Sequence, residues 1–146
     1  MVKENSMEFI HKLLETYGEL CKPLCRRLQI PQTAFDILMF LGNHPNYNSA
    51  RDIVEIRGIK ANLVSINVDR LVSEGYLERI PAPDDRRKTI LLCTEQASPI
   101  IEQGRRLQHE FYERLFEGID EEAYQVLCKS VAIIQQNLYK LWEEEV

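Results

Sequence analysis

Apolar residues recur three and four positions apart near both ends of this chain, which is the repeat of one face of an α-helix. In the first third, this repeat predicts a helix from Asn5 to Leu28, in which Pro23 should cause a kink or a break. A second helix should open at Pro31 and end at Gly42. The two apolar faces consist of Ile10, Leu13, Tyr17, Leu20 and Leu24, and of Phe35, Leu38, Met39 and Leu41.

Two shorter helices and a hairpin are predicted in the middle of the chain. Ser49 and Asp52 have the spacing of a capping box, and Gly58 should end that helix after about two turns. The next helix should span residues 60–74. Its buried side consists of Val64, Val68, Leu71 and Val72. Residues 76–92 contain two short apolar runs around prolines, acids and three consecutive bases, which predicts a β-hairpin with a basic tip.

Two long helices should follow the hairpin, one from Thr94 to about Phe116 and one that begins at Asp120. The inward residues of the first are Ile100, Leu107, Phe111 and Leu115. The second has a heptad-like apolar seam of Tyr124, Leu127, Val131, Ile134, Leu138 and Leu141. The pattern as a whole predicts a mainly α fold, a helix-turn-helix with a hairpin wing and flanking N- and C-terminal helices.

Length and composition fit a single globular chain of residues 1–146. The residues are 45% apolar and 28% charged, and no apolar run approaches the roughly 20 residues that a membrane span needs. We therefore expect no membrane partner and, without an apolar signal segment, a cytoplasmic location. The net charge is −5. Because residues 89–146 hold eleven acids and five bases, whereas residues 51–88 hold seven acids and eight bases, the acidic excess lies away from the hairpin.

Two short helices joined by a tight turn are typical of a helix-turn-helix, whose second helix fits the major groove of DNA. The positions opposite the apolar stripe of that helix are Asn62, Ile66, Asp69, Arg70 and Ser73, flanked by Ser65. Asn62 suits an adenine edge and Ile66 suits a thymine methyl group. Lys60 and Arg70 suit phosphates. A solitary exposed aliphatic residue is also common on protein surfaces, so Ile66 alone decides nothing.

The tip of the predicted hairpin concentrates cationic side chains. Arg86, Arg87 and Lys88 follow two acids, and guanidinium groups are attracted into a narrow minor groove. Asp85 can hold Arg87 in one rotamer through a charge-assisted hydrogen bond. A solvated polar turn would have the same composition, but the position of this loop after a helix-turn-helix pattern favours a DNA contact.

Three short motifs follow one another at fixed spacing: Asp69-Arg-Leu-Val-Ser-Glu-Gly-Tyr-Leu-Glu-Arg79, Asp84-Asp-Arg-Arg-Lys88 and Leu91-Leu-Cys-Thr-Glu95. Together they resemble the MarR (multiple antibiotic resistance regulator) family of winged-helix repressors. The resemblance implies a winged helix-turn-helix unit over residues 32–93 and dimerisation helices at 1–30 and 94–146. It also implies a homodimer that binds a near-palindromic site on double-stranded DNA.

The resemblance further implies that Arg87 enters the minor groove, that Asp85 orients it, and that the helix from Lys60 enters the major groove. The chain departs from the family pattern at three places. Lys60 stands where the family often has a serine cap, and Ile66 stands where a basic residue is common. Residues 96–98 replace the usual glycine. The departures at Lys60 and Ile66 affect residues that we expect to contact the operator.

We interpret the chain as a sequence-specific DNA-binding transcriptional regulator, a ligand-responsive repressor that acts as a homodimer. The resemblance implies a pocket for a phenolic or other aromatic effector between the flanking helices and the DNA-binding unit. The candidate lining residues are Tyr17, Phe35, Met39 and Phe111. Aromatic and methionine side chains also fill ordinary cores, and a plain core role explains these four residues better.

Cysteines and histidines offer an alternative, a thiol-redox or metal-responsive regulator of the same fold. Cys21 and Cys25 lie one helical turn apart, but side chains within one helix do not readily form a relaxed disulfide. The reactive cysteine of the family's organic-hydroperoxide sensors would fall near Met7, where this chain has none. The three histidines, His11, His44 and His109, lack a tight ligand spacing, so we expect no metal site and no cofactor.

Two other classes of function are weaker hypotheses. The chain lacks the glycine-rich, Gly-x-Ser-x-Gly and His-Glu-x-x-His motifs of common enzymes, so we expect no enzymatic activity. A winged-helix adaptor that binds protein would share the fold. The three consecutive bases Arg86–Lys88 favour phosphate as the partner instead.

Overall fold

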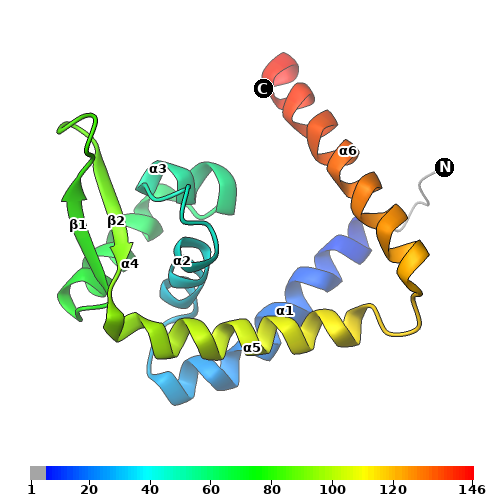
Figure 1. Ribbon diagram of the computed structural model, residues 1–146, viewed down its shortest axis with the longest axis horizontal. Helices are drawn as coiled ribbons and strands as arrows, with labels where there is room; N and C mark the ends of the chain where they lie inside the picture. Colours follow the sequence, from blue (N-terminus) through cyan, green and yellow to red (C-terminus); the bar gives the residue numbers. More distant parts are fainter. Residues whose placement is uncertain (1–5) are drawn as a thin grey trace. The chain divides into compact units, whose positions relative to one another are not determined.

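The computed structural model describes residues 6–146, which form a mainly helical fold with one two-stranded sheet (Figure 1). The elements are α1 (Ser6–Leu28), α2 (Gln32–Asn43), α3 (Ala50–Asp52), a π-helical turn η1 (Ile53–Arg57), α4 (Ala61–Ser73), β1 (Leu77–Pro81), β2 (Thr89–Cys93), a 3-10 turn η2 (Glu95–Ala97), α5 (Ser98–Leu115) and α6 (Glu121–Glu145). This order confirms the predicted fold class. The predicted helix start at Asn5 lies outside the described residues. One compact unit extends to Gln108, and a second begins at His109.

Helix α1 continues through Pro23, so the predicted break is wrong. Proline removes one backbone donor, but the turns on either side keep theirs. The last part of the helix is also fixed by packing, because Cys21, Leu24 and Cys25 are all buried in the core. Tertiary packing of this face outweighs the loss of one hydrogen bond at Pro23.

Helix α2 lies at the centre of the first unit. Its Phe35, Ile37 and Leu38 are completely buried, and α1, α4 and β2 all contact it. Helix α5 packs on the same core through Ile100 and Ile101. The core is therefore built around one helix that is apolar on nearly every side.

The helix-turn-helix begins with the predicted capping box. The Ser49 hydroxyl accepts a hydrogen bond from the Asp52 amide at 3.1 Å, and the Ser49 amide donates to the Asp52 carboxylate at 3.1 Å. The predicted two-turn helix is confirmed in extent, but its second half is the π-helical turn η1. Gly58 ends this turn with φ of +79°, and its amide donates to the Ile53 carbonyl.

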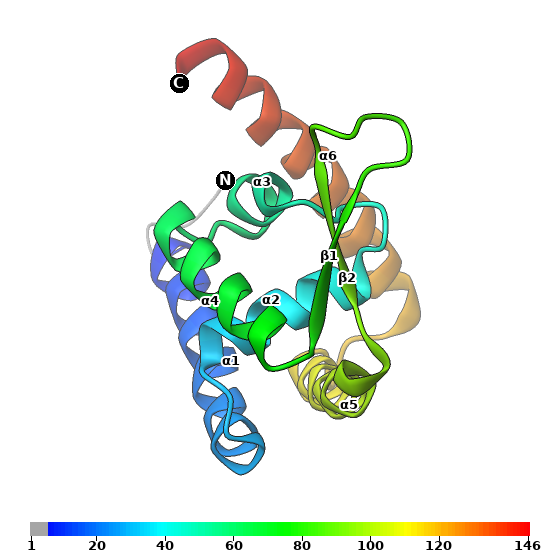
Figure 2. The ribbon, with the colours of Figure 1, turned by 90° about the vertical axis from the view of Figure 1, so that its left-hand side faces the viewer.

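The hairpin is antiparallel, with Leu77 opposite Cys93 and Pro81 opposite Thr89. β1 lies against α4 and β2 against α2, so the hairpin stands beside the helix-turn-helix (Figure 2). The buried side chains of Leu77 and Leu91 hold its base in the core. The Leu91 amide also donates to the Asn48 carbonyl at 2.7 Å, which ties β2 to the connection between α2 and α3.

The second compact unit contains the end of α5 and all of α6. Helix α6 starts at Asp120, as predicted, and the Asp120 side chain caps it by accepting a hydrogen bond from the Ala123 amide at 2.8 Å. Along α6 the predicted seam residues are 37–60% exposed, so the helix presents an apolar face to solvent. Among the described residues, no helix combines the length and the apolar character required to cross a membrane.

We expect Gly104→Ala to lower the free energy of unfolding by about 1–3 kcal/mol, because the added methyl group overpacks the core. A Cβ atom at this position would lie 3.0 Å from a Phe35 ring carbon and closer still to the Met39 sulfur, and both side chains are buried. Urea denaturation followed by circular dichroism measures the change. Gly18→Ala is the control, since its Cβ meets only the Gln32 amide at 3.3 Å and alanine favours the helix. Equal stability of the Gly104→Ala and wild-type proteins would contradict the packing described.

Candidate nucleic-acid interface

Helix α4 has one buried and one exposed face. Val64, Val68 and Leu71 pack into the core with at most 4% exposure. The opposite positions Asn62, Ile66, Asp69, Arg70 and Ser73 are exposed, as is Ser65. Burial of the first set therefore fixes the direction in which the second set faces, as the period of a helix requires. Ile66, at 63% exposure, presents an aliphatic surface to solvent.

The start of α4 is open to an external partner. Lys60 occupies the N-cap position with an extended backbone, and its side chain caps no amide. The amides of the first helical turn consequently lack a side-chain acceptor, and they carry the positive end of the helix dipole. The Lys60 side chain is exposed beside them. An anion such as a phosphate fits this end of the helix.

The hairpin tip holds Arg87 in a defined orientation. Its Nε donates to Asp85 Oδ1 at 3.1 Å and its Nη2 donates to Oδ2 at 3.4 Å. The Arg87 backbone amide also donates to Oδ1, at 3.0 Å. These hydrogen bonds from Arg87 lower the pKa of the Asp85 carboxyl, so the acid stays ionised. The predicted Asp85–Arg87 contact is therefore present in the structure.

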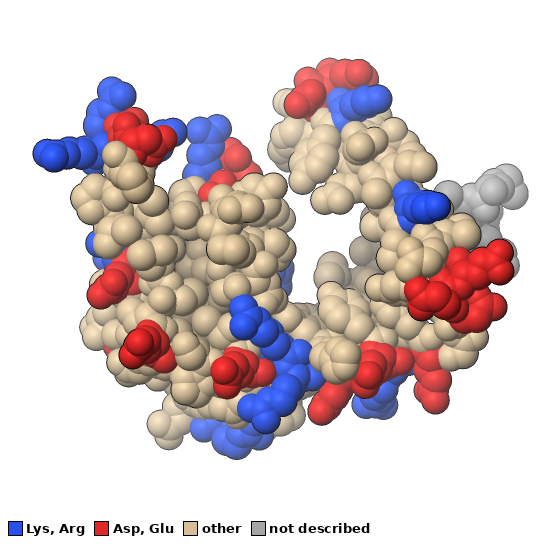
Figure 3. Space-filling model, in the orientation of Figure 1, with Lys and Arg blue, Asp and Glu red and all other residues tan. Residues whose placement is uncertain are grey.

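The guanidinium of Arg87 nevertheless remains available, because the Arg87 side chain is 91% exposed whereas that of Asp85 is 27% exposed. Arg86 and Lys88 are exposed as well. Figure 3 shows lysine and arginine atoms projecting from the end of the hairpin around a small acidic patch. The tip thus presents cations outward on a loop whose geometry is fixed by local hydrogen bonds.

Two further arginines near α4 were not predicted as site residues. Arg79 on β1 forms an ion pair with Asp69 on α4, which joins the hairpin to the exposed face of the helix. Arg51 on α3, 83% exposed, pairs with Glu55 at 2.7 Å. Both arginines line a hollow of about 410 Å³ between α3, α4 and the hairpin, together with Ser65. Arg79 ends the sequence motif that begins at Asp69, but that motif gave the arginine no role, and Arg51 had only its charge as a signal.

Arg70 is partly engaged within its own helix. Its Nε lies 3.0 Å from Glu74 Oε1, one turn further along α4. Both side chains are more than a third exposed, and exposed pairs of this kind contribute little to stability. A phosphate can therefore compete for the Arg70 guanidinium.

The four candidate effector residues are packed side chains. Phe35 and Met39 are buried against Gly104 in the first unit, and Phe111, which is 9% exposed, belongs to the second. Tyr17 is half-buried, and its hydroxyl accepts a hydrogen bond from Gln108 Nε2 at 2.9 Å. Burial raises the pKa of Tyr17, which keeps the phenol neutral. These contacts are typical of core residues.

The thiol pair Cys21 and Cys25 does not have the properties of a redox sensor. Cys21 and Cys25 are buried, and burial raises the pKa of both thiols, that of Cys25 to about 11. A reactive thiol instead needs a lowered pKa and access to solvent. Within residues 6–146, no three His, Cys, Asp or Glu side chains lie close enough together to hold a metal ion.

The comparison with family models gives one match. Residues 25–88 match the sequence model of the MarR family. The fold resembles a putative MarR family transcriptional regulator from Listeria monocytogenes complexed with 26mer DNA, with a TM-score of 0.82 and 14% identity over 96% of this chain and 93% of that one.

Two other crystal structures have the same fold. The transcriptional regulator PA3341 has a TM-score of 0.78 and 24% identity over 91% of this chain and 97% of that chain. A MarR transcriptional regulator from Methanosarcina mazei Go1 also has a TM-score of 0.78, with 19% identity over 97% of this chain and 94% of its own. At these identities the likeness concerns the fold.

We expect Cys21 and Cys25 to resist alkylation in the native protein. Because the pKa of Cys25 rises from 9.0 to about 11, its thiolate fraction at pH 8 falls about 100-fold, and burial also blocks access. Iodoacetamide labelling followed by peptide mass spectrometry measures the rate for each thiol, with the urea-unfolded protein as control. Equal labelling rates in the native and unfolded protein would restore the thiol-redox hypothesis.

Proposed function

The chain belongs to the MarR family, and from this premise we propose that it is a transcriptional regulator that binds double-stranded DNA as a homodimer. Members of this family are transcriptional regulators, not enzymes. The observation that carries the proposal is the fixed and exposed guanidinium of Arg87, on a hairpin that stands beside the exposed face of α4. A helix and a cationic loop side by side can enter neighbouring grooves of a duplex.

Each part of this surface has its own contact with DNA. Helix α4 enters the major groove, where Asn62 reads an adenine edge and Ile66 covers a thymine methyl group. Lys60 and Arg70 bind flanking phosphates, and Ser65 lies beside them. The hairpin enters the minor groove with Arg87, while Arg86 and Lys88 meet the backbone. Asp85 restricts Arg87 to one orientation, which reduces the entropy that the contact costs.

The dimer uses the apolar surfaces of the flanking helices. On α6, seam residues such as Leu127 and Val131 are 38% and 51% exposed. On α1, Met7, Phe9 and Leu14 are each more than 60% exposed. Side chains of this kind are buried in obligate homodimer interfaces. A two-fold dimer then presents two copies of the DNA-binding unit to a near-palindromic operator.

The regulator acts as a repressor whose DNA affinity responds to a small ligand. A phenolic or aromatic effector near Tyr17, Phe35 and Met39 would have to displace packed side chains. The hydrogen bond between Tyr17 and Gln108 is the polar contact that such a ligand would replace. An effector regulates only if it binds the DNA-free and DNA-bound arrangements with different affinity.

Titration of promoter DNA from beside its own gene tests the proposal. An electrophoretic mobility shift should saturate, and the affinity should fall linearly on a logarithmic plot against salt, because phosphate contacts release counterions. Binding that is absent or independent of salt would instead favour a winged-helix adaptor that binds protein.

We expect Arg87→Ala to weaken operator binding by about 1–3 kcal/mol, the range of a good groove contact. Fluorescence anisotropy with labelled operator measures the affinity, and circular dichroism checks that the helices are intact. Arg106→Ala removes the same charge from an exposed position on α5 and serves as the control. If both variants lose affinity equally, Arg87 has no specific groove contact.

We expect Leu127→Glu and Val131→Glu to dissociate the dimer, because an unpaired charge in a buried interface costs about 3–5 kcal/mol. Sedimentation velocity should show the monomer at concentrations where the wild type is dimeric. Lys129→Glu, on the opposite side of α6, should leave the dimer intact. If both the Leu127→Glu and the Val131→Glu proteins remain dimeric, the dimer interface does not include this face of α6.

A further inference from the structure

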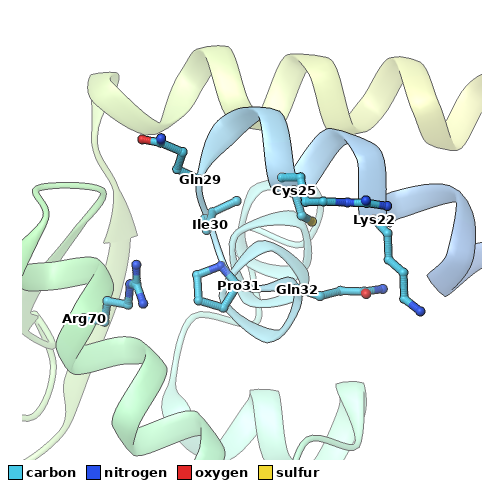
Figure 4. Close-up of a pocket in the computed structure, with 8 residues that line it drawn as sticks. Lys22, Cys25, Gln29, Ile30, Pro31, Gln32 and Arg70 are labelled. Carbon is cyan, nitrogen blue, oxygen red and sulfur yellow. The ribbon is translucent and has the colours of Figure 1, made fainter.

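A hollow of about 380 Å³ lies where the end of α1, the connection to α2 and the Arg70 side chain of α4 come together (Figure 4). We call it the corner pocket. Its volume falls within the range of about 300–1,000 Å³ that is typical of small-molecule sites. Apart from Arg70, none of the residues assigned above to DNA or to an effector lines it. The function of its lining therefore requires a separate explanation.

The lining of the corner pocket is cationic. Lys22, Arg26 and Arg70 contribute to it, and none of the described lining residues is acidic. Lys22 lies 2.5 Å from Glu19, and Arg70 lies 3.0 Å from Glu74, but both are exposed pairs that an anion can replace. The Arg26 guanidinium has no hydrogen bond or ion pair with any residue that the structure describes. The pocket thus carries uncompensated positive charge.

The first turn of α2 adds to this positive potential at the edge of the pocket. Pro31 stands at its N-cap without a side-chain cap, and the turn contains no acidic residue. The amides of such a turn have no intrahelical acceptor and carry partial positive charge. Gln32 Nε2 donates to the Gly18 carbonyl at 3.1 Å, which fixes the corner between α1 and α2.

The remaining surface of the pocket is apolar. Cys25 and Ile30 are 5% and 6% exposed, and Pro31 lies beside them. Burial raises the pKa of the Cys25 thiol to about 11, so it stays neutral and adds no negative charge. A bare oxyanion would leave this surface uncovered, whereas an organic group attached to the oxyanion would cover it.

We propose that the corner pocket binds a small organic phosphate monoester. The phosphate meets Lys22 and Arg26, which lie one turn apart on α1, and the organic group lies against Cys25 and Ile30. Arg70 lines the opposite end of the pocket from Lys22 (Figure 4). A phosphate monoester carries a charge of about −1.5 to −2 at neutral pH, which matches the two cations Lys22 and Arg26 better than the single charge of a carboxylate does. Hydrogen bonds between arginine and phosphate are also among the strongest that side chains form.

Isothermal titration calorimetry of the full chain with phenyl phosphate, in the absence of DNA, tests this site. We expect saturable binding to the wild type and a loss of about tenfold or more in affinity for Arg26→Gln, the scale of a lost hydrogen bond to a charged group. Arg27→Gln is the matched control, because Arg27 bonds to Gln103 at 2.9 Å and does not line the pocket. Arg70 is left unchanged, since it also belongs to the proposed DNA surface.

Inorganic phosphate provides the second arm and should bind more weakly than phenyl phosphate, since it leaves the apolar surface uncovered. Equal affinities for the two anions would overturn the assignment of an organic ester. The absence of saturable binding, or equal affinities of the wild type and Arg26→Gln for phenyl phosphate, would overturn the site itself. No DNA is present in these titrations, so their failure would leave the proposed DNA binding unaffected.

Discussion

The burial of α2 is the constraint on which the rest of the fold depends. Except for Asp36, every side chain from Ala34 to Leu41 is buried, and each large one contributes about 1.5–3 kcal/mol. Because α1, α4 and β2 all pack on this helix, α4 has only one orientation that buries Val64, Val68 and Leu71. The exposed face of α4 is a consequence of that packing, and so is the position of the hairpin base.

Support for the hairpin decreases from its base to its tip. Leu77 and Leu91 are held in the core, and the Leu91 amide bonds to Asn48, whereas the tip has mainly its own hydrogen bonds. Those bonds concentrate on Asp85, which binds both the backbone amide and the guanidinium of Arg87. A rigid base and a locally ordered tip allow an exposed cation to be presented with little conformational freedom, which favours recognition.

Features that depend on local chemistry could be predicted from the sequence. The capping box at Ser49 and the contact between Asp85 and Arg87 involve residues two or three positions apart, so spacing alone suggested them. The amphipathic helices were equally evident from their apolar repeats. The end of η1 at Gly58 could be predicted as well, because a helix often ends at a glycine. A glycine adopts the φ of +79° found there at little cost.

Features that depend on distant partners could not be predicted in this way. The helix continues through Pro23 because buried neighbours hold it, and the π-helical form of η1 has no signal in the residue pattern. The ion pair of Asp69 and Arg79 joins a helix to a strand, so its partners could be matched only once the fold was known. The corner pocket likewise unites residues 22–32 with Arg70, which no periodicity connects.

Arg70 connects the two proposed sites, and this has a thermodynamic consequence. It lies on the exposed face of α4 and also lines the corner pocket. A ligand in the corner pocket and a DNA phosphate would both approach the Arg70 guanidinium, so each partner weakens the other. Linkage requires the same coupling free energy in both directions. A phosphate ester could therefore release DNA through direct competition for Arg70, without a relay across the core.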